Sequence, residues 1–361
     1  MLFRSLEEDT GSSQHDKGSY SLIDYNRAGV PLMELVTEPV IHDAETAMKF
    51  AKELQLLLRY LGASDANMDK GEMRVEANIS ISKTETFGTK VEVKNINSFK
   101  SVGDAIKYEI KRHAEVLDRG EAIIQETRGW DENAGKTFSQ RKKETAHDYR
   151  YFPDPDLPKL KISEIPEFKD IAKTLPELPW ERRARFMKEY ALIESVAELY
   201  VSNIWLGDFF AHVVVKLGND LELAKLASNY ISSDYAALLK SPTGEITATG
   251  NITEDTFAAL IQMIKKNELS SRGAKDTLAI MWKEGGDPKA IAQKHGLVQK
   301  SDPEALKKMC KEIITANEKV VTEYKAGKES SLQFLIGQGM KASKGSANPQ
   351  MLGELFKVLL S

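Results

Sequence analysis

The chain has 361 residues and a formal net charge of −4, so it has no overall basic field, and any contact with nucleic acid must come from a local patch. Cys310 is the single cysteine, which excludes an internal disulfide framework and a zinc site made from cysteines. No apolar run approaches the roughly 18 residues of a membrane span, and the acidic N-terminus lacks a signal-peptide pattern. These features predict a cytoplasmic protein of two or three domains.

The first 160 residues change between helical and strand periodicity. Apolar residues at helical spacing predict a helix over 43–61, with Asp43 able to cap its start and Gly62 its end. The period becomes two in EMRVEANISI (72–81) and TKVEVKNIN (89–97), which predicts a hairpin with one apolar and one charged face. Further along, the patterns predict a helix over 101–118 and a second hairpin from 121–130 to 136–142.

After a proline-punctuated linker, the sequence is helical almost to its end. A Gly- and Thr-rich stretch near 250 suggests a further boundary. The whole chain is therefore predicted to be α+β: an antiparallel-sheet domain over 1–160, a helical domain over 161–250 and a small helical tail domain over 251–361. The predicted helices span 181–216, 220–240, 253–267, 271–284, 287–294, 302–324, 328–343 and 349–360.

Carboxylates are the residues that suggest chemistry in the first domain. They occur in LEED (6–9), at Glu34 and Glu38, and on the charged face of the first hairpin. Any single acid is by default solvated surface. Collected on a sheet face beside arginine and lysine, such acids could hold Mg²⁺, which takes carboxylates plus nucleotide phosphate oxygens. The basic side chains would then offset charge on a transferring phosphoryl group.

Five blocks in the first 160 residues resemble one known family, the B subunits of the tRNA-dependent Asp/Glu amidotransferase. The resemblance extends over residues 6–361 through three C-terminal blocks: SSRGAKDTLAIMWKEGGDP (270–288), GLVQKSD (296–302) and EYKAGKESSLQFLIGQGMKASKGSANPQ (323–350). The five N-terminal blocks are DYNRAGVPLMELVTEP (24–39), MRVEANISI (73–81), FGTKVEVKNINSF (87–99), QETRGWDE (125–132) and HDYRYFPDPDLP (147–158).

The resemblance implies a glutamine-dependent, ATP-using ligase that works in protein biosynthesis. In this family mischarged tRNA is bound by the B subunit, which uses ATP and Mg²⁺ to phosphorylate the carboxylate of Glu on tRNA(Gln) or Asp on tRNA(Asn). An A subunit releases ammonia from glutamine, and a small C subunit completes a heterotrimer. The resemblance therefore implies a catalytic cradle in the first domain and tRNA binding in the tail.

The resemblance also implies roles for individual residues. Glu8 and Glu34 match acids of the family's metal site, with Glu7 as an alternative to Glu8. The tail lysines form a local basic patch with one nearby acid, Glu329, and a solvated helix face remains the alternative interpretation. The polar wall of the cradle would comprise Arg74, Glu76, Asn78, Lys94 and Asn97, with Arg74 and Lys94 also contacting ATP. Structural ion pairs are the alternative for these five residues. The tRNA-binding lysines would be Lys325, Lys328, Lys341 and Lys344.

The N-terminus departs from the family pattern. Family members carry a longer stretch before LEED that supplies further metal-site residues, and Ser5 stands where they usually have His. Two other hypotheses therefore stay open: a non-catalytic tRNA-binding fragment of the subunit, and a ligase acting on a free small carboxylate. The segment HDYRYFPDPDLP is expected to act as a rigid clasp between domains. The absence of a presequence on this start favours a bacterial over an organellar home.

Overall fold

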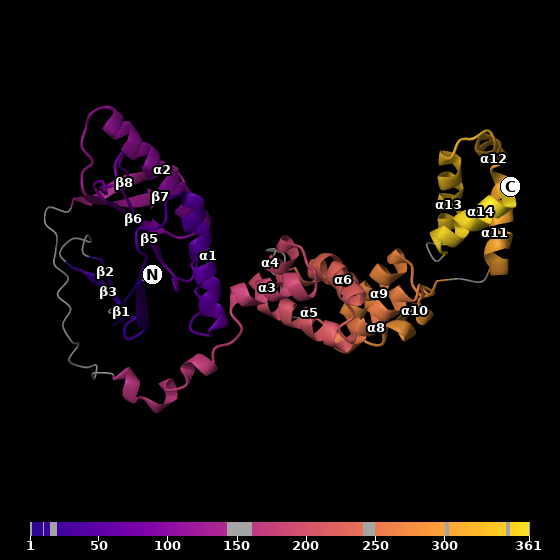
Figure 1. Cartoon of the computed structure of the whole chain (residues 1–361), viewed down its shortest axis with the longest axis horizontal. Coiled ribbons are helices and arrows are strands. Elements are labelled where there is room, and N and C mark those ends of the chain that lie inside the picture. The colour runs from indigo at the N-terminus through magenta and orange to yellow at the C-terminus, as the bar shows by residue number, and fades with distance from the viewer. Residues whose placement is uncertain are drawn as a thin grey trace. The chain divides into compact units, whose positions relative to one another are not determined.

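The computed structural model describes residues 2–9, 11–14, 20–142, 161–240, 250–299, 303–343 and 347–360. The chain divides into two compact units, Met1–Pro176 and Glu177–Ser361, which are treated separately below (Figure 1). The segment HDYRYFPDPDLP and Lys344 lie outside the described residues.

The first unit combines a four-stranded sheet with two long helices and two smaller sheets. Strand β1 pairs with β4, and β2 pairs with β3. The elements are β1 (Leu2–Glu8), β2 (Ser12–Gln14), β3 (Leu22–Asp24), β4 (Pro31–Val36), α1 (Ala44–Tyr60), β5 (Val75–Ile79), β6 (Val91–Ile96), α2 (Phe99–Asp118), β7 (Glu126–Asp131) and β8 (Lys136–Lys142). The short 3₁₀ helices η1 (Ile162–Glu164), η2 (Pro166–Phe168) and η3 (Ile171–Lys173) follow.

The four-stranded sheet has the order β5-β6-β7-β8 and is mixed. Pairs β5–β6 and β7–β8 are antiparallel hairpins, as the sequence predicts, but β6 and β7 run parallel. The parallel pair arises because α2 connects β6 to β7. The helix carries the chain back to the end of the sheet where β6 begins, so β7 then runs in the same direction as β6. The α+β prediction is confirmed, and the expected antiparallel arrangement is corrected at the centre of the sheet.

Both long helices begin at the caps that their sequences provide. The Asp43 carboxylate accepts the backbone N–H of Thr46 at 2.8 Å at the start of α1, and the Ser98 hydroxyl oxygen accepts the N–H of Ser101 at 3.1 Å at the start of α2. Gly62 follows α1 with φ of +63°, a conformation that suits glycine. The predicted positions of both helices are confirmed.

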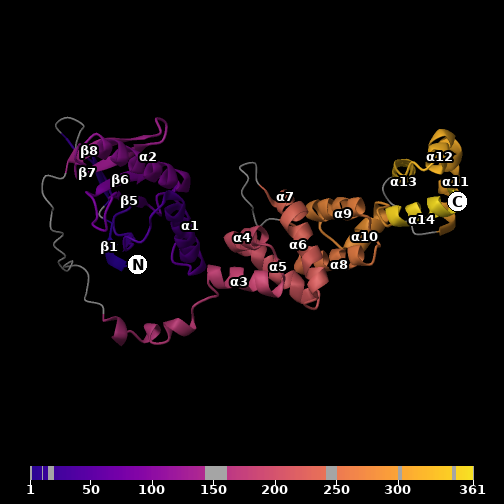
Figure 2. The ribbon, with the colours of Figure 1, turned by 45° about the horizontal axis from the view of Figure 1, so that its top comes forward.

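Helix α2 packs on one face of the sheet, and the polar side chains of β5 and β6 on the other face range from exposed to largely buried. Figures 1 and 2 show α1 and α2 lying beside each other next to this sheet. The resulting core comprises Ile79, Val93, Ile96, Val102, Ala105 and Trp130. Because strand side chains alternate between faces, the intervening polar residues of β5 and β6 point away from α2. This alternation places the polar wall predicted from the sequence on the open face.

The second unit consists of helices and their connections in its described residues, with one isolated antiparallel bridge between Leu269 and Val298. The helix predicted over 181–216 is in fact three helices, because Ala191 adopts a positive φ of +51° and Asn203 caps the start of a new helix. The helices are α3 (Pro179–Glu189), α4 (Glu194–Ser202), α5 (Ile204–Lys216), α6 (Leu221–Tyr230), the π-helix η4 (Ile231–Tyr235), α7 (Ala236–Leu239), α8 (Glu254–Lys265), α9 (Ser271–Glu284), α10 (Pro288–Lys294), α11 (Pro303–Ala316), α12 (Glu318–Lys325), α13 (Ser330–Ala342) and α14 (Pro349–Leu360).

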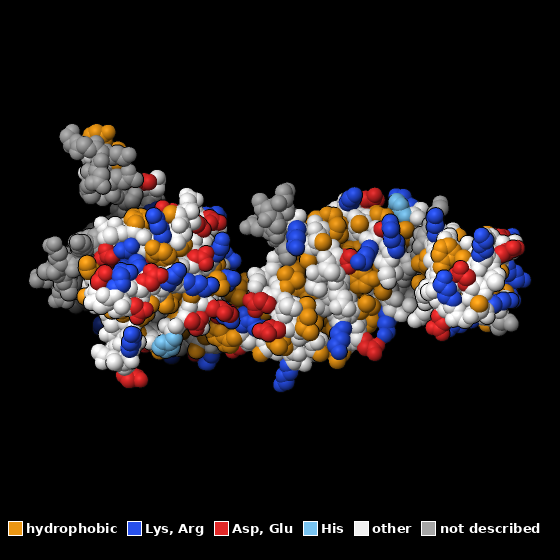
Figure 3. All heavy atoms as spheres, turned by 90° about the horizontal axis from the view of Figure 1, so that it is seen from above, with side chains coloured by type: hydrophobic (Ala, Val, Ile, Leu, Met, Phe, Trp, Pro, Cys, Tyr) orange, Lys and Arg blue, Asp and Glu red, His pale blue; other side chains and the backbone are white. Residues whose placement is uncertain are grey.

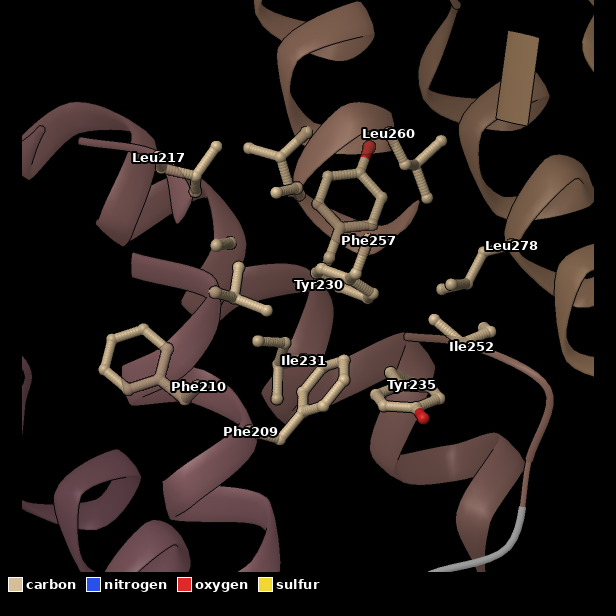
Figure 4. Packing of buried hydrophobic residues seen from close by; sticks show 14 of the residues in the cluster. Phe209, Phe210, Leu217, Tyr230, Ile231, Tyr235, Ile252, Phe257, Leu260 and Leu278 are labelled. Atoms are coloured by element: carbon tan, nitrogen blue, oxygen red, sulfur yellow. The ribbon is translucent and has the colours of Figure 1, made fainter. Parts of the chain in front are cut away.

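Two separate hydrophobic clusters stabilise these helices. The larger cluster runs from Phe186 to Ala292 and contains stacked and edge-on aromatic pairs, among them Phe209 against Phe257 (Figure 4). This larger cluster includes residues on both sides of position 250, where the sequence suggested a boundary. The smaller cluster runs from Leu306 to Leu360 and contains Cys310, where burial raises the pKa of the thiol to about 11. Within the described residues, no helix is long and apolar enough to cross a membrane.

A close helix contact at Gly207 gives the first testable prediction. A Cβ atom at this position would lie 2.4 Å from the Tyr200 carbonyl oxygen, so Gly207→Ala should lower the free energy of unfolding by about 1–3 kcal/mol through overpacking. Gly337 is the control, because no atom lies within 4 Å of its Cβ position, and Gly337→Ala should raise stability by about 0.5–1 kcal/mol. Denaturant unfolding of both variants checks the pair, and equal effects would contradict it.

Candidate functional site

The open face of β5 and β6 brings together the polar residues predicted from the sequence. Glu76, Asn78 and Lys94 share this face, and the Lys94 ammonium lies 3.1 Å from Glu76 Oε1. Arg74 precedes β5 and Asn97 follows β6, next to the final strand pair Val75–Ile96, and both side chains are exposed. The catalytic interpretation and the ion-pair alternative both allow this geometry, so the roles of these residues stay predictions.

A β-bulge shapes the end of this face. Lys94 and Asn95 of β6 lie opposite the single residue Glu76 of β5. Asn95 has a φ of +62°, and its side-chain amide donates to the Trp130 carbonyl oxygen at 3.3 Å and accepts from the Asn97 amide at 3.4 Å. Bulges bend a strand and redirect a side chain, and Asn tolerates positive φ better than most residues. The bulge therefore sets the direction of the Lys94 side chain.

Glu92 lies near Lys94, and Thr127 contacts Glu92. Neither residue belongs to the site predicted from the sequence. The parallel register places Thr127 of β7 beside Glu92 of β6, and the Thr127 hydroxyl donates to Glu92 Oε2 at 2.8 Å. Glu92 Oε1 lies 4.0 Å from the Lys94 ammonium. Strand alternation alone places Glu92 on the open face two residues before Lys94. The contribution of Thr127 depends on the parallel pairing, which strand alternation does not reveal.

The candidate metal ligands lie on the β1–β4 pair, and the register distinguishes between the two acids of LEED. Residues that lie opposite each other in this register share a face, and the face alternates along the strand. One face therefore carries the pairs Ser5–Glu34 and Glu7–Leu32, and the other carries Glu8–Pro31. Glu7, the alternative ligand, therefore shares a face with Glu34, and Glu8 does not. The described residues contain no group of three His, Cys, Asp or Glu that could hold a metal. Two carboxylates nevertheless suit Mg²⁺, which commonly takes one or two plus substrate phosphates.

Arg27 links the residue after strand β1 to the segment that precedes the polar wall. Its Nη1 donates to the Gly71 carbonyl oxygen at 2.7 Å, and its Nε lies 3.3 Å from Asp9 Oδ2. Asp9 follows β1 directly, and Gly71 lies three residues before Arg74. One guanidinium thus joins the two segments that carry the candidate metal ligands and the candidate phosphate-binding residues. The sequence analysis did not assign Arg27, although it lies in one of the blocks that carry the family resemblance.

A buried charged cluster supports the sheet from the α2 side. Glu109 of α2 is fully buried and forms a bidentate pair with Arg112 at 2.8 and 2.9 Å. His113 Nε2 and Arg128 Nε lie 3.1 and 3.3 Å from its oxygens, and the Thr137 hydroxyl donates to it. Burial alone raises the pKa of Glu109, but the contacts with His113, Arg112 and Thr137 outweigh burial and lower this pKa to about 2. The cluster joins α2 to β7 and β8.

The tail lysines that the structure describes lie on helices α12 and α13 or between them. Lys325, Lys328 and Lys341 are exposed, and Lys344 lies outside the described residues. The Lys328 ammonium lies 2.8 Å from a Glu323 carboxylate oxygen, so the patch contains an acid that the sequence analysis did not count. On the face of the molecule in Figure 3, basic and acidic side chains are interspersed.

The comparisons with known proteins cover both units. Residues 4–166 match the GatB/GatE catalytic domain, and residues 208–360 match the GatB domain. The B subunit of the aspartyl/glutamyl-tRNA(Asn/Gln) amidotransferase from Coxiella burnetii is 45% identical over 356 residues, which cover 98% of the chain and 74% of the relative. The chain belongs to the GatB family. Proteins of the same name from Herpetosiphon aurantiacus and Persephonella marina are each 42% identical and share the same coverage.

Membership of the GatB family confirms the resemblance seen in the sequence, and the chain is thus a subunit of an amidotransferase. The match to the GatB/GatE catalytic domain contains the β1–β4 acids, the polar wall, Glu92, Thr127 and the buried Glu109 cluster. The match to the GatB domain contains the tail lysines. The two groups of candidate residues therefore fall in different domains of the family, and each can be tested by its own measurement.

Proposed function

We propose that this chain activates the side-chain carboxylate of Glu on tRNA(Gln), or of Asp on tRNA(Asn), by ATP-dependent phosphorylation. An A subunit would supply ammonia from glutamine, and a C subunit would complete the complex. A carboxylate is a poor electrophile, whereas an acyl phosphate offers ammonia a good leaving group. The proposal is supported by relatives named as B subunits of the aspartyl/glutamyl-tRNA(Asn/Gln) amidotransferase.

The observation that carries the proposal is the shared open face of β5 and β6. Here Lys94 and the neighbouring Arg74 provide positive charge, and Asn78 provides an amide beside them. Such groups can orient phosphate oxygens and offset the charge that develops during phosphoryl transfer. Glu7 on β1 and Glu34 on β4 would hold Mg²⁺, which would offset negative charge on the phosphate groups. Arg27 joins the chain segments that carry these two groups, through Asp9 and the Gly71 carbonyl oxygen.

A transamidation assay tests the proposal. The chain is mixed with family A and C subunits, glutamine, ATP, Mg²⁺ and both mischarged tRNAs, and the amino acid recovered from each tRNA is identified. Conversion of Glu to Gln or of Asp to Asn would support the proposed activity and identify the substrate. Intact tRNA binding without any conversion would contradict it and would favour the non-catalytic tRNA-binding hypothesis.

The tail lysines give a second testable prediction. Lys325→Glu combined with Lys341→Glu should weaken tRNA binding and reduce the slope of log affinity against log salt by roughly one for each phosphate that is no longer neutralised. Lys328→Gln should change the slope less, because Glu323 already offsets the charge of Lys328. Binding titrations over a range of salt concentrations measure both slopes. An unchanged slope in the double variant would remove these lysines from the tRNA interface.

A further inference from the structure

Glu92 and Thr127 have no role in the mechanism proposed above, yet Glu92 lies beside its central lysine and Thr127 donates a hydrogen bond to Glu92. We propose that Glu92 is a positioning residue for Lys94 and that the Thr127 hydroxyl holds Glu92 in the required rotamer. This inference rests on the proposed function, because it assumes that the Lys94 ammonium meets a phosphate. It assigns Glu92 no contact with ATP or with the aminoacyl group.

The two carboxylates around Lys94 differ in exposure. The Lys94 ammonium lies 3.1 Å from Glu76 and 4.0 Å from Glu92. The Glu76 side chain is 45% exposed, whereas the Glu92 side chain is only 15% exposed. An arriving phosphate can therefore replace the outer partner, Glu76, while the inner partner, Glu92, stays against the sheet.

Thr127 keeps the Glu92 carboxylate in place. A largely buried carboxylate is costly unless its oxygens have partners. Oε2 accepts a hydrogen bond of 2.8 Å from the hydroxyl of Thr127, a residue that is 7% exposed. Oε1 faces Lys94. Because Glu92 and Thr127 are neighbours in the parallel β6–β7 register, the backbone of the sheet fixes both ends of this hydrogen bond.

Glu92 and the bulge at Asn95 together restrict the Lys94 side chain. A lysine side chain is a flexible four-carbon stem that loses conformational entropy whenever its ammonium is held in one place. Glu92 attracts that ammonium from the same strand, and the bulge at Asn95 directs the stem. Part of the entropy cost of ordering Lys94 is therefore met before a phosphate arrives, which favours a pre-organised site.

The test is a double-mutant cycle in the chain assembled with its A and C subunits. The readouts are the dissociation constant of a non-hydrolysable ATP analogue with Mg²⁺, the transamidation rate and the melting temperature. Lys94→Ala should weaken analogue binding by about 10- to 100-fold, as expected when a charge-assisted hydrogen bond is removed. Glu92→Gln should weaken it by roughly 3- to 10-fold in the native background and by less than about 2-fold in the Lys94→Ala background.

Two further variants sharpen the cycle. Thr127→Val keeps the shape of the side chain but removes the donated hydrogen bond, so it should reproduce the direction of the Glu92→Gln effect even if that variant folds poorly. Lys90→Ala is the control, because Lys90 lies two residues before Glu92, outside strand β6. Lys90→Ala should leave binding and rate within about 2-fold.

The outcomes separate this inference from the function on which it rests. If Lys94→Ala leaves analogue binding and rate unchanged, the proposed role of the ammonium is wrong, and the positioning role is wrong with it. If Lys94→Ala has its expected effect while Glu92→Gln weakens binding by the same factor in both backgrounds, Glu92 acts only on the general stability of the sheet. That result overturns the inference and leaves the proposed function standing.

Discussion

Glu34→Gln should lower ATP-dependent activation of the aminoacyl group by roughly 10²- to 10³-fold, because a metal ion that polarises phosphate oxygens contributes several kcal/mol to the barrier. The amide keeps the size of the side chain but loses the charge that Mg²⁺ requires. Affinity for tRNA should stay within a few-fold, since the tail lysines lie in a different domain of the family. Activation is measured as tRNA-dependent ATP consumption over a Mg²⁺ titration.

The two acids of LEED provide matched controls for this experiment. Glu7 shares a face of the β1–β4 pair with Glu34, whereas Glu8 belongs to the opposite face. Glu7→Gln should therefore cause a loss comparable to that of Glu34→Gln, and Glu8→Gln should cause a much smaller one. A large loss in Glu8→Gln with normal activity in Glu7→Gln would contradict the register argument. Near-normal activation in Glu34→Gln would remove that residue as a metal ligand.

Glu109→Ala should destabilise the first unit by about 3–5 kcal/mol, because it leaves the largely buried guanidinium groups of Arg112 and Arg128 without their shared carboxylate. Denaturant unfolding followed by tryptophan fluorescence can detect the change, since Trp130 lies in this unit. The control is Glu115→Gln on the same helix, where the side chain is 57% exposed and the expected change is within about 0.5 kcal/mol.

The same variant should change how stability depends on pH. The pKa of Glu109 falls from 4.5 to about 2 on folding, so its stabilising contribution is fully present above pH 4.5 and is lost as the pH falls towards 2. Glu109→Ala removes this contribution, and the free energy of unfolding should then decline less steeply between these two pH values. Parallel slopes for the variant and the native chain would show that Glu109 does not titrate as described.

The features predicted correctly from the sequence depend on neighbouring residues. The α1 helix follows from apolar spacing and the Asp43 cap, and the polar wall follows from strict alternation along β5 and β6. Alternation needs no knowledge of distant segments, because a strand with one buried face must expose the other. Alternation therefore predicts one shared face for Arg74, Glu76, Asn78 and Lys94, whereas Asn97 and the role of the group come from the family resemblance.

The features that the sequence left unassigned or open depend on pairing between distant segments. Thr127 meets Glu92 only because β6 and β7 are parallel, and the choice that the sequence left open between Glu7 and Glu8 as the neighbour of Glu34 depends on the β1–β4 register. A shift of one residue in that register would exchange the two acids. The contact between Lys328 and Glu323 spans a helix end, where the direction of the chain changes. Residue spacing alone does not specify any of these three arrangements.

The crossover through α2 also bears on the order in which the site is assembled. Glu92 and Thr127 are separated by 35 residues, and a parallel strand pair cannot form until the intervening helix has turned the chain back. Closing so long a loop carries an entropy cost before any strand contact repays it. The Glu92–Thr127 hydrogen bond should therefore be among the later contacts to form as the chain folds. Mutations in α2 that slow its docking would then delay maturation of the site without altering any residue on the open face.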